Sequence, residues 1–189
     1  MRAEWILLIA IGSVGLLVIL IFNRLVRQRN LVREGWSGID VQLRRRTDLV
    51  PNLVTTVKAY AAHERGLFED VAAKRASSIA ADNVPGQAAA ERALQGALGK
   101  LFALAEAYPA LKADQNFLKL QTELAEIEDQ IQMARRYYNG TTRDLNIAIQ
   151  SFPNSLIARP FGFREEPFFE LDDHSQAAAP NVAFPEAKR

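Results

Sequence analysis

The sequence of 189 residues contains no cysteine, and its only histidines are His63 and His174. The missing cysteines exclude disulfide frameworks, thiolate zinc sites, iron–sulfur clusters and cysteine nucleophiles. An excess of charge of one sign is also lacking, because 23 basic side chains stand against 22 acidic ones. A balanced chain has no field that draws it onto nucleic acid, so we expect no nucleic-acid partner. These absences favour a non-enzymatic protein of one domain, alone or with appendages.

A long run without charged side chains extends from Trp5 to Phe22. As a helix it would rise about 27 Å, close to the roughly 30 Å hydrocarbon thickness of a bilayer. A cleaved signal peptide is the alternative, but its apolar region is usually shorter and ends at small residues. Here Asn23 and Arg24 follow instead. We therefore predict a transmembrane anchor over residues 1–23, in contact with membrane lipid through residues 5–22.

The basic residues around this run are unevenly distributed. Arg2 precedes it, whereas Arg24, Arg27, Arg29 and Arg33 follow it. Basic residues are retained on the cytoplasmic side of membrane helices. We therefore expect a single-pass protein of the inner (plasma) membrane, with its N-terminus outside and the rest of the chain in the cytoplasm.

Beyond the anchor, apolar residues recur at spacings of three and four, which is typical of amphipathic helices. Pro51 interrupts this pattern, because proline lacks an N–H group and clashes with the carbonyl four residues before it. Tyr108-Pro109 and Phe152-Pro153 end later helices, since the residue before a proline avoids the helical region. The pattern predicts no strand and four helices, at about 24–46, 49–81, 88–107 and 115–151.

Each predicted helix carries an apolar seam. In the first two, Arg46 and Glu64 occupy positions that the spacing reserves for apolar residues. The seam of the fourth alternates steps of three and four, as in helices that pack nearly parallel. It comprises Phe117, Leu120, Leu124, Ile127, Ile131, Ala134, Tyr138, Thr141, Leu145, Ala148 and Phe152. Four such helices with short connections indicate an all-α helix bundle over residues 24–152.

The C-terminal region has no helical period. Residues 153–173 mix aromatic residues with prolines and acids. We favour an extended strap along the bundle over an exposed docking peptide. Residues 174–189 combine alanine, proline and polar side chains, and we expect them to be disordered.

Several short motifs occur in a characteristic order and spacing. They are Trp36-Ser37-Gly38-Ile39-Asp40, Thr47-Asp48-Leu49-Val50-Pro51-Asn52-Leu53, Tyr108-Pro109-Ala110-Leu111, Arg135-Arg136-Tyr137-Tyr138-Asn139 and Phe152-Pro153-Asn154-Ser155. Through these motifs, residues of about 20–170 resemble the LemA family of bacterial proteins. The resemblance implies one N-terminal membrane helix followed by an antiparallel four-helix bundle. It implies no activity, because the family has no established biochemical function.

The residues that could support catalysis or bind a metal do not form a known pattern. His63-Glu64 begins like a helical zinc motif, but Leu67 stands where the second histidine is required. Glu123, Glu126 and Asp129 lie outside the apolar seam, as expected of a solvated face. We therefore predict no catalytic residue, no metal site and no cofactor.

Two polar clusters are candidate interaction sites. The first is Arg44, Arg45 and Arg46, which could attract anionic lipid or pair with acids of a neighbouring helix or subunit. The second is on the last predicted helix and comprises Arg135, Arg136, Tyr137 and Asn139. We expect polar ties between this second cluster, Arg136 in particular, and Asp40 or Asp48, which would fix the register of the helices.

The sequence therefore favours a membrane-anchored scaffold or adaptor without catalysis. We expect it to form a homo-oligomer or to dock an unidentified membrane or cytoplasmic protein. The alternative is a module that binds anionic lipid or shapes the membrane. An enzyme that uses only carboxylates and serines is the least favoured hypothesis.

Overall fold

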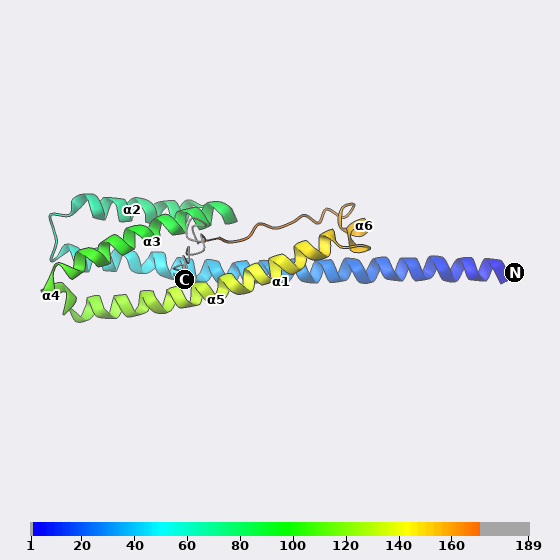
Figure 1. Ribbon diagram of the computed structural model, residues 1–189, viewed down its shortest axis with the longest axis horizontal. Coiled ribbons are helices and arrows are strands. Elements are labelled where there is room, and N and C mark those ends of the chain that lie inside the picture. Colours follow the sequence, from blue (N-terminus) through cyan, green and yellow to red (C-terminus); the bar gives the residue numbers. More distant parts are fainter. Residues whose placement is uncertain (1, 171–189) are drawn as a thin grey trace, which may run out of the picture.

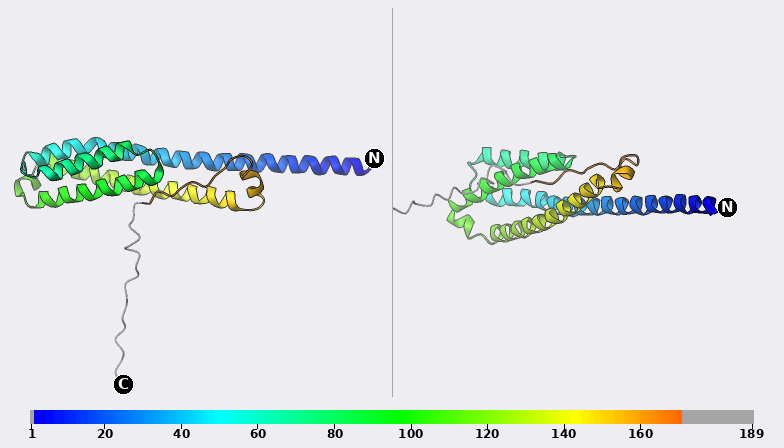
Figure 2. Two further views of the ribbon diagram at one scale, coloured as in Figure 1. Left: turned by 90° about the horizontal axis from the view of Figure 1, so that it is seen from above. Right: turned by 45° about the vertical axis from the view of Figure 1, so that its right-hand side comes forward.

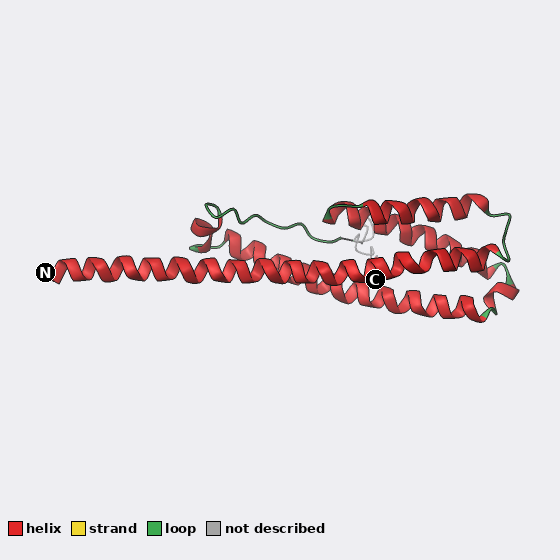
Figure 3. Cartoon of the chain, turned by 180° about the vertical axis from the view of Figure 1, so that it is seen from behind, coloured by secondary structure: helices red, strands yellow, loops and turns green. Residues whose placement is uncertain are grey.

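The computed structural model describes residues 2–170, and within this range every regular element is a helix (Figures 1 and 3). The elements are α1 (Arg2–Lys58), α2 (Arg65–Ala80), α3 (Val84–Glu106), α4 (Pro109–Lys112), α5 (Gln115–Gln150) and α6 (Asn154–Ala158). The predicted all-α fold is confirmed over these residues. The expected tail, 174–189, and the end of the expected strap, 171–173, lie outside the described residues.

The helix α1 has 57 residues, about 86 Å at the usual rise, and it includes the whole apolar run. Among the helices of residues 2–170, α1 is the one whose length and composition would allow it to cross a membrane. Its N-terminal part extends beyond the other helices (Figure 2), and nearly all of its side chains before Ile21 are exposed.

The predicted break between 46 and 49 is wrong, because α1 continues through Pro51 to Lys58. A proline in a helix leaves the carbonyl four residues before it without a donor. That carbonyl belongs to Thr47, and it accepts a hydrogen bond of 2.6 Å from Nε of Arg75 on α2. A neighbouring helix therefore supplies the donor that Pro51 lacks, and the chain turns only after Lys58.

The long helices run in alternating directions (Figure 1), with α5 packed along α1 and the α2–α3 hairpin packed beside the C-terminal part of α1. The backbones of α1 and α5 approach closely at Gly35, where an added Cβ would lie 3.0 Å from Cα of Tyr138. The predicted seam of α5 is buried or half-buried along its length. Phe152 is the exception, at 80% exposed, because α5 ends at Gln150.

Two hydrophobic clusters form the core. One joins α1 to α5 on the side nearest the N-terminus and includes Leu43 and Ile131. The other joins α1 to α2, α3, α4 and α5 at the opposite end and includes Val50 and Leu94. The boundary between them falls at Arg46, the position where the apolar pattern of α1 is interrupted.

After α5 the chain turns back through α6, and residues 163–170 run extended along α5 in the opposite direction (Figure 1). We call residues 163–170 the strap. The predicted extended strap of residues 153–173 holds over 163–170, where Phe163 and Phe169 are buried, but it is wrong for Asn154–Ala158, which form the helix α6.

Candidate functional site

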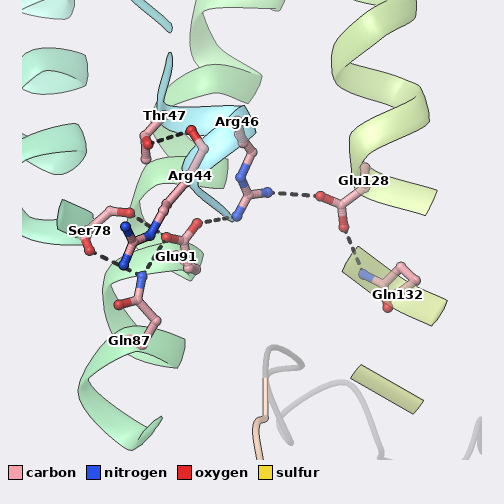
Figure 4. A network of polar contacts seen from close by, with 8 residues as sticks. All are labelled: Arg44, Arg46, Thr47, Ser78, Gln87, Glu91, Glu128 and Gln132. Atoms are coloured by element: carbon pink, nitrogen blue, oxygen red, sulfur yellow. Dashed lines mark hydrogen bonds and ion pairs between the residues drawn. The ribbon is translucent and has the colours of Figure 1, made fainter. Parts of the chain in front are cut away.

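A buried polar layer crosses the body between the two hydrophobic clusters (Figure 4). At its centre, Arg46 is 3% exposed and Glu91 is fully buried. One guanidinium nitrogen of Arg46 forms an ion pair with Glu91 on α3, and the other lies 2.8 Å from Oε2 of Glu128 on α5. Arg46 therefore links three helices through one side chain.

The second oxygen of Glu91 completes the layer. It accepts hydrogen bonds from the hydroxyl of Ser78 on α2 and, at 2.8 Å, from Nε2 of Gln87. Glu128 in turn accepts from Gln132 at 2.7 Å. Each of the four long helices thus contributes to the layer.

The arrangement suits structural specificity better than chemistry. Glu91 is closed to solvent, and its acceptors are occupied by donors from three helices. Desolvation makes a buried ion pair a poor source of stability compared with apolar side chains, but an unpaired partner is strongly penalised. The layer therefore penalises packings that separate Arg46 from Glu91. Within residues 2–170, no group of three or more acidic or histidine side chains is placed to bind a metal ion.

The strap is held by the amide side chains of Asn139 and Asn146 on α5. Oδ1 of Asn139 accepts from the backbone N–H of Phe169 at 2.9 Å, and Nδ2 donates to the carbonyl of the same residue at 3.1 Å. Asn146 makes the same pair of bonds with Glu166, both at 2.9 Å. Each asparagine therefore binds the strap as a neighbouring β-strand would.

The spacing of these two contacts follows from elementary geometry. Asn139 and Asn146 are seven residues apart, which is about 10.5 Å along a helix. Glu166 and Phe169 are three residues apart, which is about 10 Å in an extended chain. The two repeats match, so the same face of α5 meets the strap twice.

Aromatic packing secures the strap at both ends. Phe169 lies 5.8 Å from Trp36, and Trp36 lies 5.7 Å from Tyr138, ring centre to ring centre. The hydroxyl of Tyr138 donates to the carbonyl of Pro167 at 2.8 Å, and burial raises the pKa of this tyrosine. At the other end, the guanidinium carbon of Arg29 lies 5.0 Å from the ring centre of Phe163.

The first predicted cluster is divided between surface and interior. Arg44 is exposed and pairs with Asp40 at 3.0 Å, one turn earlier on the same helix. Arg45 donates to Gln42 at 3.2 Å on the surface, and only Arg46 enters the core. The position of Arg46 in the apolar seam indicated from the sequence that this arginine is buried. No feature of the sequence near Glu91 indicated that Glu91 is its partner.

The second predicted cluster lies beside the strap. Arg135, Arg136 and Asn139 line a groove with Phe168 and Phe169, and Tyr137 is 47% exposed. The predicted tie of Arg136 does not form: within residues 2–170, Arg136 has no ion pair with Asp40 or Asp48. The physical reason is that neither aspartate lines the groove of Arg136. Asp40 and Asp48 line the groove between α1 and the α2–α3 hairpin, and Asp48 also lines a groove between α1 and α5 farther along the body.

The chain is similar in sequence to several known proteins. It is 26% identical over 174 residues to magnetosome protein MamQ of Magnetospirillum gryphiswaldense, covering 78% of this chain and 64% of MamQ. The match to magnetosome protein MamQ 2 of Paramagnetospirillum magneticum is also 26% identical, over 175 residues, with 79% and 64% covered. The chain thus spans less than two thirds of these relatives. Protein LemA of Metamycoplasma hominis is 25% identical over 155 residues, with 80% and 69% covered.

The motifs that first suggested a resemblance lie largely inside one matched region. The model of the LemA family matches residues 35–184, which is most of the chain. The chain therefore belongs to the LemA family.

Proposed function

We propose that the protein is a non-enzymatic scaffold that anchors a helical body to the inner membrane and self-associates there. The observation that carries this proposal is the continuity of α1. Its exposed apolar run and the residues that it contributes to the core of the body belong to one helix without a break. An unbroken helix holds the body at a fixed angle to the anchor, which suits a structural component.

Self-association is supported by the side of the body that the α2–α3 hairpin leaves open. A groove there is lined by α1 and α5 alone, with Arg45 and Asp48 on the α1 side and Glu123, Glu126 and Asp129 on the α5 side. The exposed side chain of Met133 lines the same groove, at 46% exposed. Charge of both signs beside an apolar side chain suits contact with a second copy.

The similarity to magnetosome proteins is consistent with a structural role, because those relatives are named for an assembly and not for a reaction. The arginines that follow the apolar run support an orientation with the N-terminus outside and the body in the cytoplasm.

The alternative, a module that binds anionic lipid through Arg44, Arg45 and Arg46, loses support. Arg46 is buried, and Arg44 follows Phe22 by 22 residues of continuous helix, about 33 Å. Attraction to headgroups fades within a Debye length of about 8–10 Å. These arginines are too far from the end of the run to act on lipid.

The test is the mass of the full-length protein extracted in mild detergent, measured by native mass spectrometry. We expect a uniform homo-oligomer that dissociates when Met133→Glu is introduced, with Leu118→Glu, at a similarly exposed site on α5, as the control. A monomer would refute self-association. Protease accessibility of the body in sealed vesicles tests the orientation separately.

A further inference from the structure

Three large apolar side chains are exposed close together around α6. Phe152 is 80% exposed, Leu156 is 62% exposed and Phe161 is 55% exposed. We call these three residues the foot. Single exposed apolar residues are ordinary on protein surfaces, but a group of them indicates a contact with something outside the chain.

The foot lies beside the end of the apolar run. The ring of Phe161 meets that of Phe22, the last residue of the run, at 5.1 Å between ring centres. Phe163 packs on the same ring at 5.8 Å. Figures 1 and 3 show α6 alongside α1, at the place where α1 extends beyond the other helices. A bilayer that covers the run would therefore end at the height of the foot.

The chemistry around the foot fits that position. Aromatic and aliphatic side chains beside basic ones are the composition of protein surfaces that rest in the headgroup region. Arg24 lines the same cleft as Phe152 and Pro153, and Arg159, just after α6, is exposed. Basic side chains so close to the end of the run can reach anionic headgroups, unlike Arg44 and Arg45.

We propose that the foot inserts into the headgroup region of the leaflet next to the body and forms a second membrane contact beside the anchor. This inference rests on the proposed anchoring of α1. Two contacts restrain rotation of the body about the axis of α1, which one spanning helix leaves free. The foot also ties the start of the strap to the membrane surface.

The test uses the absence of cysteine in the chain, because single cysteines can be labelled without background. Full-length Leu156→Cys and Phe152→Cys carry an environment-sensitive fluorophore in vesicles of phosphatidylcholine and phosphatidylglycerol. A nitroxide on the upper acyl chain of the lipid is the quencher. Val14→Cys, inside the run, reports on the anchor, and Leu118→Cys, at the far end of α5, reports on water.

We expect quenching at both foot positions to be severalfold stronger than at Leu118→Cys and comparable to that at Val14→Cys. Quenching at Val14→Cys without quenching at the foot would overturn this inference and leave the anchor intact. A fluorophore at the foot whose emission reports an apolar environment but is not quenched by the lipid nitroxide would also overturn the inference, because a second copy of the chain would then cover the foot. No quenching at Val14→Cys would refute the anchoring itself.

Discussion

Removing the guanidinium of Arg46 tests whether the polar layer holds the body together. In Arg46→Ala the carboxylate of Glu91 stays fully buried and loses its only cationic partner among the described residues. Breaking a buried ion pair on one side costs about 3–5 kcal/mol. Glu128 adds little to this loss, because its side chain is 30% exposed and water can replace the arginine. Against a typical domain stability of about 5–15 kcal/mol, the loss is large.

Two further variants separate the layer from general effects of substitution. Arg44→Ala removes an exposed arginine, with 76% of its side chain in solvent, two residues earlier on the same helix. Its surface pair is worth at most about 0.5 kcal/mol. Arg46→Met combined with Glu91→Met removes both buried charges at similar volume, and such replacements are often neutral or stabilising. We therefore expect the double variant to recover most of the stability that Arg46→Ala loses.

The assay is urea unfolding of the full-length chain in mild detergent. A Trp5→Phe background leaves Trp36, which packs inside the body, as the only fluorescent tryptophan. Circular dichroism in parallel checks that one transition is followed, and extrapolation to zero urea gives the free energy of unfolding. A loss of no more than about 1 kcal/mol in Arg46→Ala, or a double variant as unstable as Arg46→Ala, would show that the buried ion pair does not hold the body together.

Five other substitutions give outcomes that the structure fixes in sign. Asn139→Ala or Asn146→Ala each removes two hydrogen bonds to the strap, which are worth about 1–3 kcal/mol together. Hydrogen exchange should then be faster at the backbone amides of the strap and unchanged in the helices. Gly35→Ala should destabilise by about 1–2 kcal/mol in urea because its Cβ meets the α5 backbone, whereas Gly38→Ala, which faces open space, should stabilise by about 0.5–1 kcal/mol. Asp114 accepts hydrogen bonds from the backbone N–H of Phe117 and from the hydroxyl of Tyr60, and both lower the pKa of its carboxyl group. The contribution of Asp114 to stability is therefore present above about pH 4 and is lost as the pH falls through the lowered pKa. Stability measured against pH should therefore fall less steeply in Asp114→Asn on the acid side, and an unchanged slope would contradict this assignment.

Periodic features of the fold could be predicted, because they depend on the spacing of residues within short stretches of sequence. The seam of α5 follows from the spacing of its apolar residues. Asp114, a residue type that favours helix N-termini, caps that helix by accepting from the N–H of Phe117 at 2.9 Å. The helical state of residues around Pro51 could not be predicted. It depends on Arg75, whose proximity to the carbonyl of Thr47 exists only once α2 has packed on α1.

The same limit applies to the polar layer and to the strap. An arginine in an apolar seam indicates that Arg46 needs a partner, but the choice of Glu91 is made by the packing of α3. Asn139 and Asn146 are spaced by one heptad, which suggests a common face, yet the extended segment that they bind is set by the turn through α6. Pairings that join distant segments therefore had to come from the structure.

The register between α1 and α5 connects the polar layer to the proposed membrane contact of the foot. A seam with a repeat of seven residues can slip by one repeat and still bury its apolar side chains, and the slip would move α5 by about 10.5 Å along α1. Such a slip would carry the foot away from Phe22 and Phe169 of the strap away from Trp36, both of which are on α1. The slip would also separate Arg46 on α1 from Glu128 on α5, so the ion pair between them opposes it.

This connection predicts that stability and register can be separated. In Arg46→Met combined with Glu91→Met, the body should remain stable, but the penalty against slipping is gone. We expect the fluorophore at Leu156→Cys to show a broader range of lipid quenching in this variant than in the parent chain, resolved as several fluorescence lifetimes. The control is Arg44→Ala, which leaves the buried layer unchanged and should keep the parent distribution. A distribution that stays narrow in the double variant would mean that apolar packing and the strap set the register without Arg46.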